Sequence, residues 1–102
     1  MTWVKVCQVS ELPPGEKTSI EAMGKNILVV NVDASFYAVD AICSHEAQDL
    51  GSGILIDNKI TCTRHLSQFD VTTGEALNTP ATVPLKRFEV KVEDDMVYVL
   101  VD

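Results

Sequence analysis

The chain has 102 residues, and its 15 acidic and 8 basic residues give a formal net charge of −7. This length allows a single domain with one modest core, and no stretch approaches the ~18 apolar residues of a membrane span. The acidic charge disfavours nucleic acid and anionic membrane surfaces as partners and favours brief docking to a basic patch on another protein.

The start of the chain predicts a strand and not a targeting segment. Residues Met1 to Cys7 lack the basic segment and apolar run of a secretory signal, so we expect a cytoplasmic protein. The stretch from Trp3 to Val9 alternates like a strand and contains Cys7, one of three cysteines. An odd number of cysteines in a reducing compartment favours metal binding or buried thiols over disulfides, and we interpret Cys7 as a packing residue.

Short predicted strands, separated by turn-forming clusters, occupy much of the remaining chain. They are rich in β-branched and aromatic residues and comprise Ile27–Val32, Phe36–Val39, Ile54–Ile56, Ile60–Cys62, Phe88–Val92 and Met96–Val101. Phe88, Val90 and Val92 alternate with charged residues, which predicts a strand with one face in the core. No segment shows sustained helical periodicity. The pattern therefore indicates an all-β sandwich or barrel.

Two irregular stretches, Cys43 to Gly53 and Cys62 to about Gln68, interrupt the strands. Each begins with a cysteine that is closely followed by a histidine, in the sequences Cys43-Ser44-His45 and Cys62-Thr63-Arg64-His65. Both histidines of the chain belong to this pattern. Thiolates and imidazoles are ligands of zinc and of iron-sulfur clusters, whereas magnesium and calcium prefer oxygen. The residues therefore indicate a zinc or iron-sulfur site.

The spacing of the four ligands favours an iron-sulfur cluster. Structural zinc sites usually take one pair of cysteines and one pair of histidines from two compact turns. Here each loop offers one Cys and one His, as a binuclear cluster with two cysteines on one iron and two histidines on the other requires. Mixed zinc sites also exist, so a zinc-stabilised structural or interaction domain remains an alternative.

These residues resemble the Rieske iron-sulfur family, whose pattern is Cys-x-His, about sixteen residues, then Cys-x2-His. The match extends beyond the ligands to Leu50 and Gly53, and to Phe69-Asp70 and Thr73-Gly74 after the second loop. The closing stretch is similar to the C-terminal strands of the small ferredoxins that serve ring-hydroxylating oxygenases, in the segments Thr82-Val83-Pro84-Leu85, Phe88-Glu89-Val90 and Val97-Tyr98-Val99. The resemblance covers essentially the whole chain.

The resemblance implies one Rieske domain over residues 1–102, an antiparallel β sandwich or barrel with an inserted cluster-binding subdomain at about 42–81. It implies one 2Fe-2S cluster with Cys43 and Cys62 on one iron and His45 and His65 on the other. The implied function is that of a soluble one-electron carrier between a reductase and a terminal acceptor such as an oxygenase. The histidine edges would then lie at the surface that meets these partners.

The residues beside the ligands depart from the family pattern in two ways. The second loop commonly reads Cys-Pro-x-His-Gly, but here Thr63 and Leu66 replace the Pro and the Gly. We interpret these changes as tolerated drift, with shielding of the cluster by Leu66 as the alternative. Ser67 matches a hydroxyl donor of the quinol-oxidising relatives, while Phe69 replaces their second donor, a Tyr. We therefore predict a midpoint potential in the lower part of the Rieske range of about −150 to +300 mV.

The sequence offers no catalytic constellation. It contains no nucleophile with a paired base, no phosphate-binding glycine loop and no spare histidine, so we predict an electron-transfer protein and not an enzyme. A further alternative is a cluster-less Rieske-fold subunit of a larger redox enzyme. The presence of all four ligand residues argues against that alternative.

Overall fold

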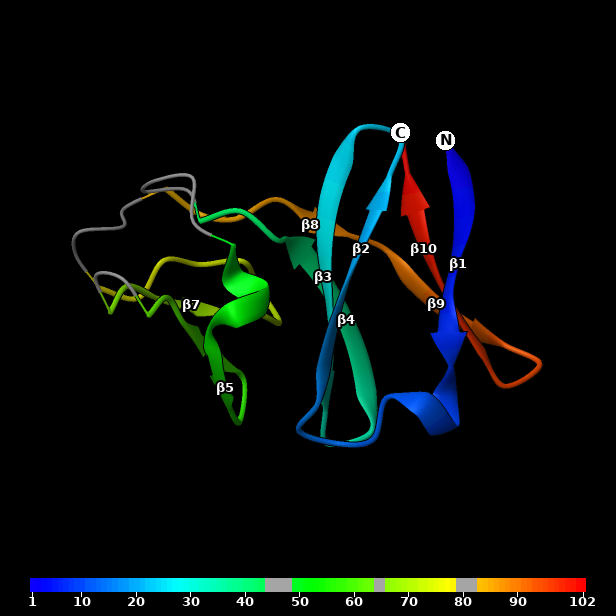
Figure 1. The fold of residues 1–102 in the computed structure, drawn as a ribbon, viewed down its shortest axis with the longest axis horizontal. Helices are drawn as coiled ribbons and strands as arrows, with labels where there is room; N and C mark the ends of the chain where they lie inside the picture. The colour runs from blue at the N-terminus through cyan, green and yellow to red at the C-terminus, as the bar shows by residue number, and fades with distance from the viewer. Residues whose placement is uncertain (44–48, 64–65, 79–82) are drawn as a thin grey trace.

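The structure is a computed structural model that describes residues 1–43, 49–63, 66–78 and 83–102. Within these residues, the strands form three antiparallel sheets (Figure 1). The terminal sheet contains, in spatial order, β1 (Thr2–Gln8), β10 (Met96–Val101) and β9 (Val90–Glu93). The central sheet contains β2 (Lys17–Ala22), β3 (Lys25–Val32), β4 (Ser35–Asp40) and β8 (Arg87–Phe88), and the distal sheet contains β5 (Ile54–Ile56), β6 (Lys59–Thr61) and β7 (Gln68–Asp70).

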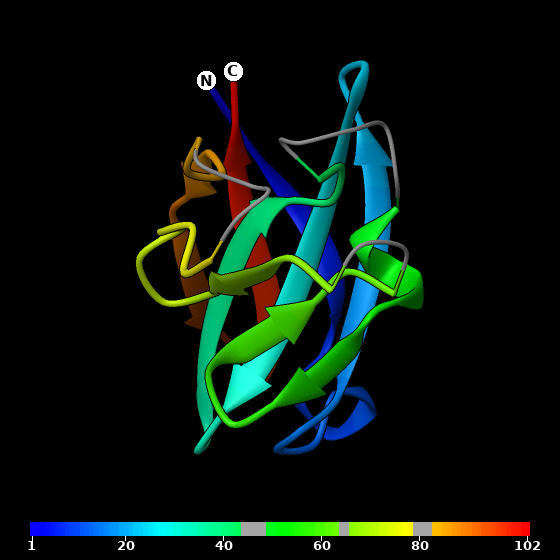
Figure 2. The same ribbon diagram turned by 90° about the vertical axis from the view of Figure 1, so that its left-hand side faces the viewer.

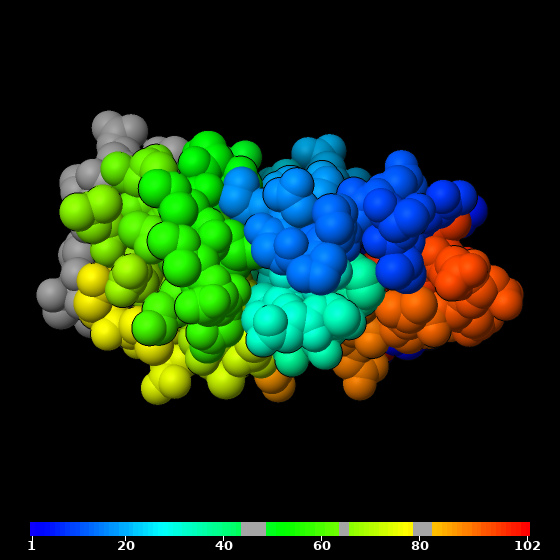
Figure 3. Space-filling model, turned by 90° about the horizontal axis from the view of Figure 1, so that it is seen from below, coloured from blue at the N-terminus to red at the C-terminus, as the bar shows by residue number. Residues whose placement is uncertain are grey.

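Two short 3-10 helices, η1 (Val9–Glu11) and η2 (Leu50–Ser52), lie in the connections. The three sheets follow one another along the longest dimension of the molecule, whose extents are 40 × 27 × 19 Å (Figures 1 and 3). The distal sheet therefore forms one end of the molecule and the terminal sheet lies toward the other (Figure 1). No described helix is long and apolar enough to cross a membrane.

Strand β3 is buried on both faces and connects two cores. Ile27 and Val29 pack into a core with the terminal sheet, whereas Leu28 and Val30 pack into a core with the distal sheet. Successive side chains of a strand point to opposite faces, so one apolar run serves both layers. The first core also contains Leu12, Ala38, Val97, Val99 and Val101. The second also contains Val39, Ala41, Cys43, Leu50, Ile60, Cys62, Phe69, Val71 and Leu85.

Tight turns with left-handed backbone connect the long hairpins. Both central residues have positive φ in the turns Met23-Gly24, Asp33-Ala34 and Asp94-Asp95. Two-residue turns of this kind match the right-handed twist of the flanking strands. The turns explain how strands separated by only two residues in the sequence pair directly with one another.

The structure confirms the predicted all-β class and corrects several elements. The predictions did not include β2 or β7. The predicted strand Phe88–Val92 is divided, because β8 belongs to the central sheet and β9 to the terminal sheet. The chain crosses between the sheets at Glu89, whose carbonyl accepts a hydrogen bond from the Leu100 N–H at 2.9 Å. Val92 is 51% exposed, so the expectation that it faces the core is wrong.

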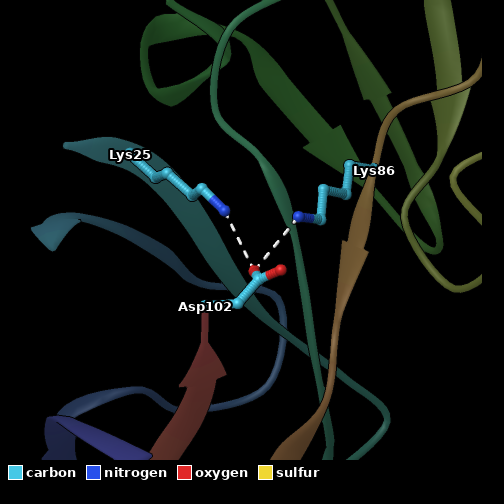
Figure 4. Close-up of polar contacts among 3 residues, drawn as sticks. All are labelled: Lys25, Lys86 and Asp102. Carbon is cyan, nitrogen blue, oxygen red and sulfur yellow. Dashed lines mark hydrogen bonds and ion pairs between the residues drawn. The ribbon is translucent and has the colours of Figure 1, made fainter. Parts of the chain in front are cut away.

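The last residue links the end of β10 to the central sheet. The Asp102 Oδ1 atom accepts hydrogen bonds from Lys25 Nζ at 2.9 Å and from Lys86 Nζ at 3.3 Å (Figure 4). The two ammonium groups lower the pKa of Asp102 to about 2. The same contact raises the pKa of Lys25.

Candidate metal centre

Cys43 lies just after β4, where the chain leaves the central sheet. Its side chain is buried in the core that the central and distal sheets share. The Leu50 N–H donates to the Ala41 carbonyl at 2.6 Å, and Ile42 forms an isolated bridge with Asp49. These contacts close the base of the first loop, whose residues 44–48 lie outside the described structure.

The return of the first loop is fixed against two neighbouring strands. Leu50 is fully buried, and the Gly51 carbonyl accepts a hydrogen bond from Lys17 Nζ at 2.6 Å. A Cβ at Gly53 would lie 2.4 Å from the Thr61 carbonyl oxygen, so this position requires glycine. Leu50 and Gly53, both expected from the family resemblance, thus hold the loop against the hairpin that leads to Cys62.

Cys62 lies just after β6, and backbone hydrogen bonds close the second loop around it. The Cys62 N–H donates to the Ser67 carbonyl at 2.8 Å, and the Leu66 N–H donates to the Cys62 carbonyl at 3.0 Å. Cys62 is buried in the same core as Cys43, and both cysteines are free. The structure therefore places the two predicted thiol ligands at the starts of two loops that return to one core.

The predicted histidine ligands, His45 and His65, lie outside the described residues. The described part of the chain accordingly contains no group of three or more Cys, His, Asp or Glu residues that could hold a metal ion. Within that part, the candidate ligands are the thiols of Cys43 and Cys62. Whether an iron-sulfur group fits between these thiols can be tested on the side chains that pack around them.

Ser67 supplies a test of whether such a group fits this site. Its side chain is fully buried, and its Oγ has no hydrogen-bond partner among the described residues. An unpartnered buried hydroxyl is costly, and native proteins normally satisfy it. A sulfur-rich group held by the neighbouring thiols would provide an acceptor for the hydroxyl proton. The donor set and this hydroxyl therefore fit a 2Fe-2S cluster.

Phe69 and Leu66, the other predicted neighbours of the ligands, have opposite environments. Phe69 is fully buried in β7, pairs with Ile60 of β6 and contributes its ring to the core. Leu66 is 65% exposed and has a left-handed backbone, with φ of 59°. Phe69 therefore excludes water from the core side of the second loop, whereas Leu66 lies on the surface.

Asn78 is a supporting residue that the sequence analysis did not identify. Its Oδ1 accepts from the Gln68 N–H at 2.7 Å, and its Nδ2 donates to the Leu66 carbonyl at 3.2 Å. The Leu77 N–H also donates to the Gln68 carbonyl at 2.8 Å. The segment around residue 77 therefore supports the second loop. A single Asn in an irregular stretch gives no sequence signal for this role, because the contact spans ten or more residues.

The turn after β7 is held by Asp70, as part of the segment expected from the resemblance. The Asp70 carboxylate accepts hydrogen bonds from the Thr72 N–H at 2.9 Å and from the Thr72 hydroxyl at 2.6 Å. Burial alone would favour the neutral acid, but these hydrogen bonds prevail and hold the pKa of Asp70 below its usual value. The turn then reaches Gly74, whose carbonyl accepts from the Leu85 N–H at 2.7 Å.

Cys7 lies in β1, in the sheet farthest from the second core (Figure 1). It is half-buried and packs against the core of the terminal sheet, which confirms its interpretation as a packing residue. Burial, together with the negative charge of Glu11, raises the pKa of its thiol. Cys7 is therefore separated from the candidate metal ligands.

Comparison with known proteins gives a match over nearly the whole chain. The sequence pattern described as the Rieske [2Fe-2S] domain matches residues 2–89. The ferredoxin component of biphenyl 2,3-dioxygenase from Rhodococcus jostii is 42% identical over 99 residues, which cover 97% of this chain and 92% of that protein. Similarity at this level extends through the ligand loops and the strands that support them.

Solved structures give the same result for the fold. The ferredoxin of carbazole 1,9a-dioxygenase from Nocardioides aromaticivorans superimposes with a TM-score of 0.95 at 30% identity and covers 100% of both chains. A chain in the complex of reduced oxygenase and oxidized ferredoxin in carbazole 1,9a-dioxygenase gives a TM-score of 0.92 at 38% identity, over 95% of this chain and 91% of that chain.

Proposed function

Because the chain belongs to the Rieske [2Fe-2S] domain family, we propose that Cys43 and Cys62 hold one iron of its cluster and His45 and His65 the other. The chain is a ferredoxin-type electron carrier with a Rieske 2Fe-2S cofactor, and it is not an enzyme. Its relatives support neither the zinc-stabilised domain nor the cluster-less subunit. The assignment of the histidines rests on their spacing from the cysteines.

The observation that carries the ligand assignment is the burial of two free thiols in one core beside an unpartnered hydroxyl. Cys43 and Cys62 follow different strands, yet both enter the core between the central and distal sheets. Ser67 Oγ lies buried in the second loop without a partner among the described residues. A group that contains sulfur acceptors and takes two thiolates would satisfy all three side chains.

The residues around the site have separable tasks. Leu50 and Phe69 are fully buried and exclude water from the core side of the loops. Ser67 offers a hydroxyl proton, and backbone hydrogen bonds from Cys62 and Leu66 fix the path of the second loop. When bound, the cluster supplies a one-electron redox couple. The protein supplies the fixed ligands, the dry environment and the hydrogen bond that adjust it.

We infer that the partners are a reductase that supplies the electrons and a terminal oxygenase that receives them. The support is that several relatives are ferredoxin components of dioxygenases and that a similar chain occurs in a complex of oxygenase and ferredoxin.

We also place the protein in the cytoplasm and treat residues 1–102 as one domain, with the cluster-binding part at about 42–81. We expect two neutral imidazoles to raise the midpoint potential, and the charge of −7 and the absence of a hydroxyl donor at Phe69 to lower it.

The three cysteines allow a test with an internal control. We expect Cys43→Ser and Cys62→Ser to lose the bound iron and the visible absorption of the purified protein, because each variant removes one thiolate ligand. Cys7→Ser should retain both, since Cys7 packs in the other core. Iron content per chain, measured by elemental analysis, decides the result. Full iron in Cys43→Ser or Cys62→Ser, or loss of iron only in Cys7→Ser, would contradict the assignment.

A further inference from the structure

Leu66 adopts a backbone conformation that is unfavourable for leucine. Its φ of 59° lies in the left-handed region, where the Cβ of an L-residue crowds the backbone and where glycine has no such cost. The Rieske loop commonly has glycine at this position, so the leucine replaces the residue that fits best. Its side chain is 65% exposed, and burial within the described chain does not offset the strain.

The strained conformation is fixed from both sides of Leu66. Its N–H donates to the Cys62 carbonyl at 3.0 Å, and its carbonyl accepts from Asn78 Nδ2 at 3.2 Å. The Cys62 N–H also donates to the Ser67 carbonyl at 2.8 Å. A loop held in this way has little freedom to withdraw the leucine side chain, so the chain presents an apolar group to solvent at a fixed place.

A second exposed leucine lies on the adjacent segment. Leu77 is 40% exposed, and its N–H donates to the Gln68 carbonyl, two residues beyond Leu66. We name Leu66 and Leu77 together the leucine rim. Both segments lie at the distal end of the molecule, which faces the viewer in Figure 2. This end contains the second ligand loop, which begins at Cys62.

We propose that the leucine rim is an apolar docking contact for the terminal oxygenase, and that Leu66 determines which oxygenase surfaces this chain accepts. The inference rests on the proposed function. The occupant follows from continuity: a partner that takes an electron must approach the ligand loops, and Leu66 is four residues from Cys62 in the same loop. A similar chain also occurs in a complex of oxygenase and ferredoxin.

Apolar contact and charge have different roles in this docking. The net charge of −7 acts at long range and increases the rate of encounter with a basic partner. A buried apolar anchor acts at short range, and residues of this kind carry much of the binding energy of an interface. The oxygenase surface that fits this chain therefore has an apolar area that covers Leu66 and a net basic character that attracts the acidic chain.

The test compares Leu66→Gly with a matched control. Leu66→Gly relieves the backbone strain and removes only the exposed side chain, so the variant should fold at least as well as the wild type. Met23→Gly is the control, because Met23 also has a positive φ, of 53°, and is 59% exposed, but lies in the turn between β2 and β3. Each protein is titrated against the purified oxygenases of the carbazole 1,9a-dioxygenase and biphenyl 2,3-dioxygenase systems.

We expect Leu66→Gly to bind the oxygenase roughly tenfold more weakly, which is the effect of losing one buried leucine contact. Its melting temperature should equal or exceed that of the wild type, and its midpoint potential should not change. Met23→Gly should bind as the wild type does. Leu77→Ser, the second rim variant, should also bind more weakly. This variant tests the rim at a position whose backbone is not strained.

Four results would overturn the proposal. Unchanged binding by Leu66→Gly would show that the rim is not a docking contact. A shifted potential with unchanged binding would assign Leu66 to shielding of the cluster. A wild-type dimer that dissociates in Leu66→Gly, observed by sedimentation, would assign the rim to a second copy of the chain. If the wild-type chain contains the cluster but reduces neither oxygenase, the proposed partner is wrong, which is distinguishable from failure of the rim alone.

Discussion

We expect the hydroxyl group of Ser67 to raise the midpoint potential of the cluster. It is fully buried, and its Oγ has no partner in the described part of the chain. A hydroxyl proton directed at cluster or ligand sulfur stabilises the more negative, reduced state. Phe69 carries no hydroxyl, so the second donor of the quinol-oxidising relatives is missing here, and we propose Ser67 as the donor.

We expect Ser67→Ala to lower the midpoint potential by on the order of 60 mV, which is a tenfold change in a one-electron equilibrium. The measurement is a spectroscopic redox titration of the purified protein. Ser52→Ala is the control, since the Ser52 hydroxyl already donates to the Asp49 carbonyl at 2.9 Å and its loss should leave the potential unchanged. An equal or higher potential in Ser67→Ala would show that this hydroxyl does not reach the cluster.

The carboxylate of Asp102 gives a prediction that is independent of the cofactor. Its pKa is lowered to about 2 by Lys25 and Lys86, from an ordinary value of 3.8 (Figure 4). A lowered folded-state pKa means that the carboxylate stabilises the fold above pH 3.8, and that this contribution is lost as the pH falls toward about 2.

We expect the double variant Lys25→Met, Lys86→Met to raise the pKa of Asp102 toward its ordinary value. Carboxyl-carbon NMR titration of the wild type and the variant measures this directly. Lys59→Met, which changes a lysine of β6, is the charge control and should leave the pKa of Asp102 low. A wild-type Asp102 that titrates at the ordinary value would contradict the contact at the end of β10.

At the residue scale, the sequence indicates the candidate thiol ligands but not the groups that pack around them. Cys43 and Cys62 could be predicted because each is followed within three positions by one of only two histidines. The backbone strain at Leu66 depends on its φ angle, and the hydrogen bonds of Asn78 to Leu66 and Gln68 join separate segments of the chain. Neither is encoded in the local spacing of residue types, which explains why sequence analysis treated Leu66 as drift.

At the scale of elements, the turn from β7 toward β8 depends on Gly74. Its φ is +80°, and a Cβ there would lie 2.4 Å from the Leu85 carbonyl oxygen. Gly74 also accepts the Leu85 N–H hydrogen bond at 2.7 Å. The close approach of two backbone segments thus joins the turn after β7 to the segment that leads back to the central sheet.

Alanine at two glycines should separate strain from this close approach. Gly24→Ala introduces a residue with φ of +77° in open space and should cost about 1–2 kcal/mol. Gly74→Ala adds the overlap with Leu85 and should cost a further 1–3 kcal/mol, by analogy with ~1–3 kcal/mol for overpacking. Urea unfolding followed by circular dichroism gives both values. Equal losses in the two variants would contradict the close packing at Gly74.

The elements whose bounds are predicted best are those with a continuous apolar run between clear turns. The bounds of β5 and β10 agree with the predicted Ile54–Ile56 and Met96–Val101. Strand β2 was not predicted because Lys17–Ala22 is largely polar and lies at the edge of its sheet. Strand β7 is only three residues long and exists through its pairing with β6. Local patterns also could not show that Phe88 and Val90 belong to different sheets.

At the scale of the whole molecule, the central sheet lies between the other two sheets. The two faces of β3 contribute to both cores, so the central sheet packs on the distal sheet with one face and on the terminal sheet with the other. The candidate ligands Cys43 and Cys62 belong to the core between the central and distal sheets, and the leucine rim lies at the distal end of the molecule (Figures 1 and 2). This arrangement presents the redox site at one end of an elongated acidic molecule.

The most direct test of the account is the absorption and electron paramagnetic resonance spectrum of the purified protein before and after reduction by dithionite. We predict a red-brown protein whose reduced form gives the low-average-g signal of a binuclear cluster with histidine ligands. A colourless protein that contains zinc, or one that takes up no iron on anaerobic reconstitution, would contradict the assignment of Cys43, His45, Cys62 and His65 as cluster ligands.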